Sequence, residues 1–251
     1  MTEETKQHST LPVNLREMLK AEAAGIAKRI SAPSGDVIKV SLDKKFTFPN
    51  GTVQTGPFEA VVVDFVSANY MYDGAYNSQQ VESPKCFALG PSPATMVPSD
   101  ASPQRQAESC AVCPNNQFGS GTGNGKACKN HRLVALLPID ADADTPIMVL
   151  KVSPGALKHF DKYATAVTQM PSVDEDGSLR PTFLQEVITT IALDPNESYP
   201  SLRFGKPTRL PQEQADYFAG RFMEARKRLL TEPEITAPVA KAPGMKQRPR
   251  R

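Results

Sequence analysis

The four cysteines are the residues whose types and spacing most directly suggest chemistry. Two of them form a C-x2-C motif, Cys110-Ala-Val-Cys113, and the others lie upstream and downstream of it. A C-x2-C turn lets two thiolates reach one metal ion, and four thiolates complete a tetrahedral Zn²⁺ site with no open position. The pattern therefore predicts one structural zinc ion, bound by Cys86, Cys110, Cys113 and Cys128.

All four cysteines fall within residues 77–130, which are rich in Ser, Pro, Gly, Asn and Gln and show almost no periodicity. A loop of this length inside a domain is uncommon unless something else orders it. The segment has too few large apolar residues for hydrophobic burial to do so, and zinc binding can supply the missing free energy. We therefore expect residues 77–131 to be a zinc-loop insertion.

Other interpretations of the cysteines stay open at this point. They could be unrelated free thiols, or the C-x2-C motif could be a redox pair. A redox pair is favoured by a helix N-terminus after its first cysteine, whereas Pro114-Asn-Asn follows Cys113. His131, three residues after Cys128, could also replace one cysteine as a zinc ligand.

A glycine-rich run, Phe118-Gly-Ser-Gly-Thr-Gly-Asn-Gly-Lys126, lies between the last two cysteines. A Walker motif needs Ser or Thr after its lysine, and Ala127 stands there, so nucleotide hydrolysis is not predicted. Two interpretations remain. The run is either a flexible tip, or a tip whose neighbouring cations touch phosphates, namely Lys126, Lys129, His131 and Arg132.

Aromatic and basic residues elsewhere suggest a nucleic-acid interface. Sites for single strands combine cations along the backbone with aromatic rings on which bases stack. The candidate stacking residues, all in one polar and aromatic-rich segment, are Tyr70, Tyr72 and Tyr76. The candidate phosphate contacts are Lys44, Lys45, Lys126, Lys129 and Arg132. Phe46 and Phe48 share one face of a strand, which we interpret as core packing.

Little in the sequence predicts catalysis. The histidines are His8, His131 and His159, and no G-x-S-x-G, H-E-x-x-H or paired-carboxylate motif stands out. We therefore predict that the protein is not an enzyme. The formal net charge of +2 neither favours nor excludes a nucleic-acid partner, because binding depends on local rather than net charge.

Hydrophobic periodicity predicts a β-rich α+β fold. The expected strands are 37–42, 45–48, 58–69, 132–137, 147–152, 183–193 and 202–204, with Pro49-Asn-Gly51 as a hairpin turn. The expected helices are 13–30, 154–167 and 211–230. We divide the chain into a disordered leader (1–11), one domain (12–230) and a disordered basic tail (231–251). The tail carries Lys241, Lys246, Arg248, Arg250 and Arg251.

The compartment can also be predicted. No segment approaches the about 18 consecutive apolar residues of a membrane helix. The first ten residues are polar and lack the apolar region of a secretory signal. We therefore expect a cytoplasmic protein with no membrane partner, in a compartment that keeps cysteines reduced.

The cysteine region resembles bacteriophage proteins that bind single-stranded DNA. The resemblance is carried by Cys110-Ala-Val-Cys-Pro-Asn-Asn-Gln-Phe-Gly-Ser120 and Gly125-Lys-Ala-Cys-Lys-Asn130, with weaker similarity over residues 35–230. It implies an OB-like five-stranded barrel with an inserted zinc loop, flanked by N-terminal and C-terminal helices. This chain departs from the family in the segment after Cys86, Phe-Ala-Leu-Gly-Pro, where the family has a more polar turn.

The same resemblance implies a non-catalytic single-stranded DNA-binding protein of phage replication or recombination, located in the host cytoplasm. Its further partners would be replication or recombination proteins. Many members end in an acidic tail that recruits them, whereas this chain ends in a basic one. The preference between DNA and RNA and the formation of a homo-oligomer stay open. The alternative is a zinc-ribbon interaction module that acts on a polymerase or a transcription complex.

Overall fold

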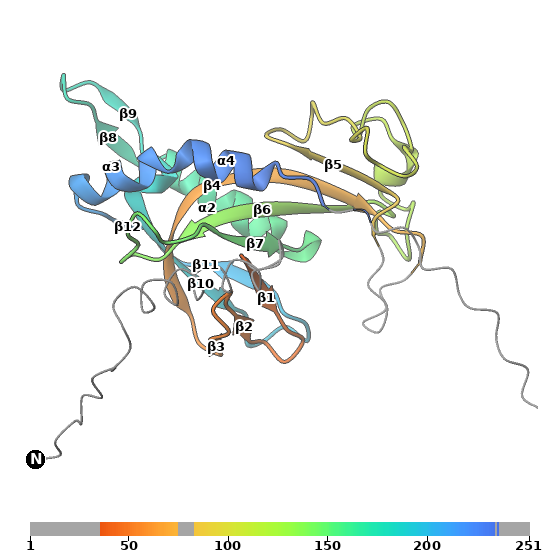
Figure 1. Cartoon of the computed structure of the whole chain (residues 1–251), viewed down its shortest axis with the longest axis horizontal. Helices are drawn as coiled ribbons and strands as arrows, with labels where there is room; N and C mark the ends of the chain where they lie inside the picture. Colours follow the sequence, from red (N-terminus) through yellow and green to blue (C-terminus); the bar gives the residue numbers. More distant parts are fainter. Residues whose placement is uncertain (1–35, 75–82, 234, 236–251) are drawn as a thin grey trace, which may run out of the picture.

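A computed structural model describes residues 36–74, 83–233 and 235 (Figure 1). The expected leader, the expected helix 13–30 and Tyr76 lie outside these residues. So do all five cations of the basic tail.

Ten of the described strands join in one curled sheet, which forms a half-barrel (Figure 1). Its order is β11-β10-β4-β6-β7-β1-β2-β3, with β12 beside β10 and β5 beside β4. The strands are β1 (Val37–Val40), β2 (Phe46–Thr47), β3 (Val53–Gln54), β4 (Phe58–Met71), β5 (Cys86–Gly90), β6 (Lys129–Leu137), β7 (Met148–Val152), β10 (Val187–Leu193), β11 (Leu202–Phe204) and β12 (Thr208–Arg209). The predicted β-rich α+β class is confirmed.

The helices and a second hairpin complete the fold. The helices are α2 (Leu157–Thr168), α3 (Gln212–Gly220) and α4 (Phe222–Leu229), with short 3-10 turns η1 (Pro114–Asn116), η2 (Pro154–Ala156) and η3 (Leu184–Glu186). Strands β8 (Pro171–Val173) and β9 (Leu179–Pro181) form a separate hairpin. The expected helix 211–230 is therefore two helices, which meet at Arg221. The Asn-Gly turn is confirmed, with Gly51 at a φ of 85° between β2 and β3.

Strand β4 organises the sheet. It has 14 residues, so it extends for ~45 Å. One edge pairs with β6 along much of its length, while the other pairs first with β10 and then with β5. A β-bulge between Val62 and Asp64 inserts one residue into the pairing with β6. Because side chains alternate along a strand, this insertion exchanges the two faces for every residue that follows.

Each face of the sheet therefore carries its own core. On one face, Val62 before the bulge and Phe65 after it pack with α2, where the Phe65 and Phe160 rings lie 5.0 Å apart. On the other face, Val61, Val63 and Val66 pack against α3 and α4. The curl also brings β2 toward the start of β4, with the Phe46 and Phe58 rings 4.9 Å apart. Core packing of Phe46 is thus confirmed.

A buried ion pair joins the bulge to α4. The Asp64 carboxylate lies among valines, and the Arg226 guanidinium binds both of its oxygens, with Nη2 3.0 Å from Oδ1. This contact raises the pKa of Arg226. Removing one partner of a buried pair leaves an uncompensated buried charge, which costs more than the intact pair contributes.

We predict that Asp64→Ala lowers the free energy of unfolding by about 3 kcal/mol, because Arg226 keeps a partly buried charge without a partner. Urea denaturation of the variant measures this change. Arg105→Ala, which breaks an exposed pair with Asp100, is the control and should cost less than about 1 kcal/mol. Equal losses in the two variants would show that Asp64 does not anchor α4.

Candidate nucleic-acid interface

The four cysteine side chains converge on one small cavity beneath the end of the sheet. Cys86, Cys110, Cys113 and Cys128 line a cavity of about 10 Å³ together with Asn69 and Asn116. A cavity of this size has room for roughly one water molecule. All four cysteines are buried and none forms a disulfide. The sequence therefore identified residues that the fold does bring together.

The prediction of a structural zinc ion is nevertheless wrong. Among the residues that the structure describes, which include all four cysteines and His131, no group of three or more His, Cys, Asp or Glu side chains could hold a metal ion. The thiols behave as small apolar groups instead. Burial, followed by the neighbouring cysteines, raises the pKa of Cys128 to about 12, so this thiol stays protonated at neutral pH.

Amide side chains and backbone hydrogen bonds order the loop that zinc was expected to order. Asn116 Nδ2 donates to the Cys110 carbonyl at 2.7 Å, and Asn116 Oδ1 accepts from Asn130 Nδ2 of β6 at 2.9 Å. Asn130 also donates to Asn69 of β4 at 2.6 Å. The Cys128 N–H donates to the Asn115 carbonyl at 2.8 Å. The polar residues whose abundance suggested a zinc site thus form the hydrogen bonds that order the loop.

Strand β5 inside this loop was missed from the sequence. Its run Cys86–Gly90 is short and lies between proline-rich segments, so its periodicity is weak. The Ser102 hydroxyl holds the following chain against it, because it accepts from the Phe87 N–H at 3.0 Å and donates to the Phe87 carbonyl at 3.2 Å. The loop therefore begins with a strand that extends the sheet.

The glycine-rich run is a tightly folded turn. Gly119 and Gly123 have φ angles of 84° and 63°, which L-residues rarely adopt. A Cβ on Gly121 would lie 2.7 Å from the Lys126 carbonyl carbon. The Gly119 and Gly121 N–H groups both donate to the Gly125 carbonyl, at 3.0 and 2.9 Å. The glycines thus permit a close backbone approach in a hydrogen-bonded turn.

Aromatic and basic residues meet on one face at the end of β4. Tyr70 pairs directly with Lys129 of β6, and directly opposed residues lie on the same face. Lys151 of β7 reaches this face and places Nζ 4.5 Å from the Tyr70 ring centroid. Tyr72, two residues after Tyr70, is 36% exposed, whereas Tyr70 is only 8% exposed. Tyr72 is therefore the accessible ring, and we call this surface the Tyr72 face.

Below this face the side chains are closely packed. Tyr70 packs with Ala68, Phe87 and Ile235, and burial raises the pKa of its hydroxyl. Burial and the Lys151 charge lower the pKa of the neighbouring His131 to about 3, so the imidazole is neutral at physiological pH. Lys151 was not identified from the sequence. The available signal was that Lys151 is the only charged residue in a short strand whose other residues are apolar.

The chain returns to this face at its C-terminal end. Ile235, beyond α4, packs on the cluster of Ala68, Tyr70 and Phe87. The sequence after Ile235 carries five cations and no acidic residue. The attachment point of the basic tail therefore lies beside Tyr70, which the sequence alone could not reveal.

The other predicted phosphate contacts lie elsewhere. Arg132 is on the opposite face and pairs with Asp161 of α2, with Nη2 3.1 Å from Oδ2. Lys44 donates to the carbonyls of Pro195 and Glu197 at 2.9 and 2.6 Å, near the start of β4. Lys45 pairs with Asp43 at 2.6 Å. The structure thus joins Tyr70, Tyr72 and Lys129 but separates them from these three cations.

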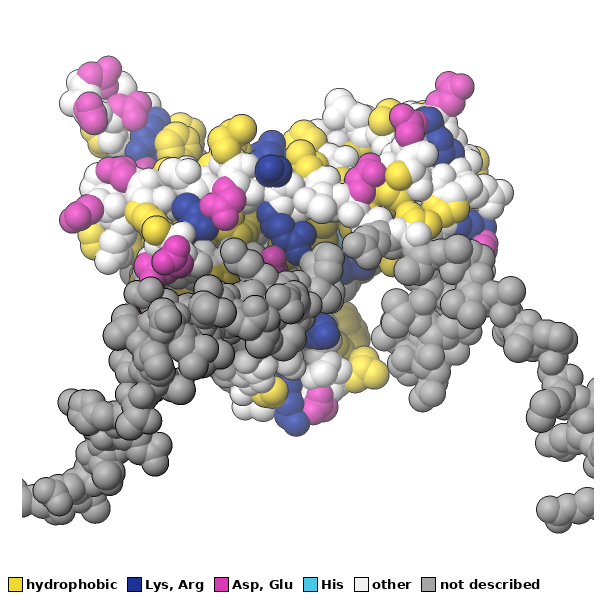
Figure 2. All heavy atoms as spheres, in the orientation of Figure 1, with side chains coloured by type: hydrophobic (Ala, Val, Ile, Leu, Met, Phe, Trp, Pro, Cys, Tyr) yellow, Lys and Arg dark blue, Asp and Glu magenta, His cyan; other side chains and the backbone are white. Residues whose placement is uncertain are grey.

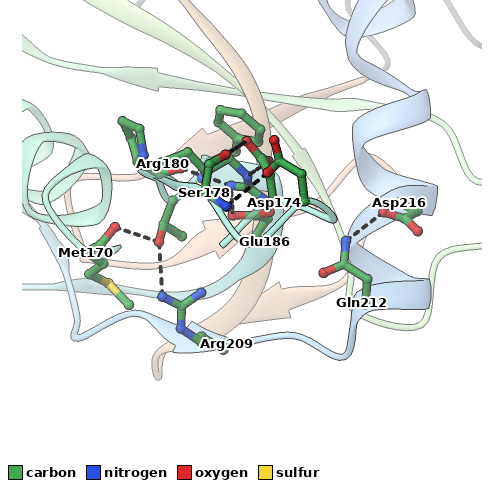
Figure 3. A network of polar contacts seen from close by, with 12 residues as sticks. Met170, Asp174, Ser178, Arg180, Glu186, Arg209, Gln212 and Asp216 are labelled. Carbon is green, nitrogen blue, oxygen red and sulfur yellow. Dashed lines mark hydrogen bonds and ion pairs between the residues drawn. The ribbon is translucent and has the colours of Figure 1, made fainter. Parts of the chain in front are cut away.

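A second groove lies between the β8–β9 hairpin and α3. It measures about 600 Å³ and carries Asp174, Glu175, Asp176 and Asp216. Figure 2 shows acidic side chains gathered at the tip of this hairpin. Several of the polar groups already have partners, as Figure 3 shows: Arg180 bridges Asp174 and Glu186, and Gln212 binds Asp216 at 2.8 Å. The Arg180 contacts join the hairpin to η3, whereas the Gln212–Asp216 contact lies within α3.

Asn116→Ala should loosen the cysteine loop, because the change removes the donor to the Cys110 carbonyl and one of the two acceptors of the Asn130 amide. We expect the free energy of unfolding to fall by about 1–3 kcal/mol. Limited proteolysis should cut within residues 100–127 faster than in the unmodified protein. Asn124→Ala, an exposed asparagine on the same loop, is the matched control. Equal protease resistance of the two variants would contradict the role of Asn116.

The Arg180–Glu186 pair predicts a stability that depends on pH. The hydrogen bonds from Arg180 hold the pKa of Glu186 below its usual 4.5. The pair therefore stabilises the fold fully above the unfolded pKa, and this contribution is lost as pH falls below 4.5. Glu186→Gln should flatten the decline of melting temperature in this acidic range. The exposed Glu175→Gln should keep the original profile, and matching profiles for both variants would rule out the pair as its source.

Comparisons with other proteins return no match from protein-family models, from curated proteins or from solved structures. The resemblance to phage proteins thus stays an expectation from the sequence. Within the described part of the chain, no helix combines the length and apolar character needed to cross a membrane.

Proposed function

We propose that the protein binds single-stranded DNA and that it catalyses no reaction. The observation that supports this most directly is the composition of the Tyr72 face. One end of the sheet places two lysines from different strands beside the Tyr70 ring, and the accessible ring of Tyr72 follows two residues later. Cations that follow a phosphate backbone and a ring on which a base stacks are the two elements of such sites.

The basic tail adds to the same surface. Its five cations follow Ile235, which packs beneath the Tyr72 face. The tail contains no aromatic residue, so it attracts phosphates without distinguishing bases. The sheet supplies the fixed contacts and the tail raises the local positive charge.

The fold gives this proposal a second basis. OB-like folds bind single strands on a curled β-sheet. In this protein β2 curls over the start of β4 through Phe46 and Phe58, and α2 fills the interior. We propose that the curled sheet is the OB-like part of the molecule and that the cysteine loop is an insertion into it.

The wider biological role follows from the sequence resemblance alone. It is a part in phage replication or recombination, in the host cytoplasm, with proteins of those processes as further partners. The zinc-ribbon alternative loses its basis, because the structure describes no metal-binding group around the cysteines.

Fluorescence anisotropy with labelled single-stranded and duplex oligonucleotides tests the proposal. The protein should prefer single strands, and its affinity should fall with salt by about 0.7 log units per phosphate contact for each tenfold increase. Lys129→Gln with Lys151→Gln should make the slope shallower by about 1.4. Tyr72→Ala should weaken binding by roughly 1–3 kcal/mol through lost stacking.

Lys158→Gln with Lys162→Gln is the matched control, because it removes two exposed lysines from α2 on the opposite face. This control should leave the single-strand affinity nearly unchanged. Truncation after Ile235 should weaken binding to single strands and duplex alike. Equal effects of the two lysine pairs, or the absence of any binding by the unmodified protein, would overturn the proposal.

A further inference from the structure

The most exposed aromatic ring among the described residues stands at the tip of the cysteine loop. Phe118 is 78% exposed, although the loop around it is well packed. A phenylalanine in water forgoes the free energy that burial of its ring would contribute. The sequence alone indicates no role for Phe118.

The loop holds this ring in a defined position. Ser120 Oγ donates to the Gln117 and Asn115 carbonyls at 2.6 and 2.9 Å, and it accepts from the Ala127 N–H at 3.0 Å. These bonds close the chain immediately on both sides of Phe118. At Gly121 the backbone passes so close to Lys126 that a side chain could not be accommodated. A ring presented from such a turn loses little conformational entropy when a ligand binds to it.

A cation accompanies the ring. Lys126 Nζ lies 5.0 Å from the Phe118 ring centroid, in cation–π contact. The same ammonium lies 3.4 Å from Asn116 Oδ1, which restricts its position. The pair therefore offers a flat apolar surface and a positive charge at adjacent points, and these match a nucleotide's base and phosphate.

The tip is connected to the Tyr72 face. Lys129 Nζ donates to the Lys126 carbonyl at 2.7 Å, so one lysine of the face touches the base of the tip. Lys126 and Lys129 also lie on either side of Cys128, which is anchored in the buried cavity. Lys129 and Lys126 therefore connect the Tyr72 face to Phe118 through two successive contacts.

We propose that Phe118 is a second base-stacking platform, and that Lys126 binds the phosphate beside the stacked base. The ligand is a nucleotide of the same single strand that contacts the Tyr72 face, so this inference rests on the proposed function. The loop acts as a fixed arm that extends the binding path beyond the sheet.

The absence of tryptophan from the chain allows a direct test. Phe118→Trp introduces a single tryptophan whose emission is quenched when a base stacks on it. Val112→Trp is the matched control, because Val112 is 76% exposed on the same loop and carries no aromatic ring. The probe is an oligothymidylate of about 30 nucleotides, long enough to cover more than one OB-sized site. Anisotropy of the labelled probe reports binding independently of stacking.

We expect the oligothymidylate to quench Phe118→Trp and to leave Val112→Trp nearly unchanged at saturation. Phe118→Leu, which keeps an apolar side chain but removes the ring, should weaken binding about tenfold, and Phe118→Tyr should restore it. Binding without selective quenching, together with full affinity of Phe118→Leu, would overturn the platform and leave the Tyr72 face standing. Absence of binding by the unmodified protein would overturn the proposed function itself.

Discussion

The rest of the structure depends on the pairing of β4. This strand is shared by every part of the sheet: β6 follows one edge, and β10 and β5 divide the other. The bulge before Asp64 lets one strand serve two cores, because it turns Phe65 toward α2 and Val66 toward α4. The Arg226 side chain neutralises the carboxylate that the bulge brings inward. The far end of β4 is thereby placed beyond both cores, where it carries Tyr70 and Tyr72.

The cysteine loop shows how a polar segment can be ordered without a large apolar core. Its composition gives few apolar side chains but many amides, and each amide can donate and accept. Asn69, Asn116 and Asn130 use this capacity to connect two strands of the sheet with the loop. The thiols occupy the space that remains and pack as small side chains. The result is a rigid support for the glycine turn, on which the exposed ring of Phe118 stands.

Much of the strand content could be predicted from sequence, because β4, β6 and β7 contain short apolar runs rich in valine and leucine and the Asn-Gly turn is specific. The bulge could not, since the run of valines before Asp64 fits either register. The β8–β9 hairpin was hidden because each of its strands has only three residues, too few to show a period.

The candidate site was predicted less well than the fold. The clustering of the cysteines in the sequence predicted that they converge in the fold. It did not predict that hydrogen bonds between amides, rather than zinc, order their loop, because these bonds depend on strands that are distant in sequence. Similarly, the sequence around Lys151 and around Ile235 does not indicate that both residues pack against Tyr70. Lys44 is a residue type suited to binding phosphate, yet its ammonium donates to two backbone carbonyls across the curl of the sheet.

One side-chain amide, that of Gln185, bonds to a part of the β4 edge that is otherwise unpaired in the part of the chain that the structure describes. Between the last residue of β4 that pairs with β10 and the first that pairs with β5, residues 62–66 have no partner strand on that edge among the described residues. A valine-rich edge with free backbone groups is a template on which another chain can add a strand. Gln185 of η3 donates from Nε2 to the Val63 carbonyl at 2.6 Å and occupies this interval. The glutamine therefore occupies a backbone acceptor within this interval, to which the strand of another chain could otherwise bond.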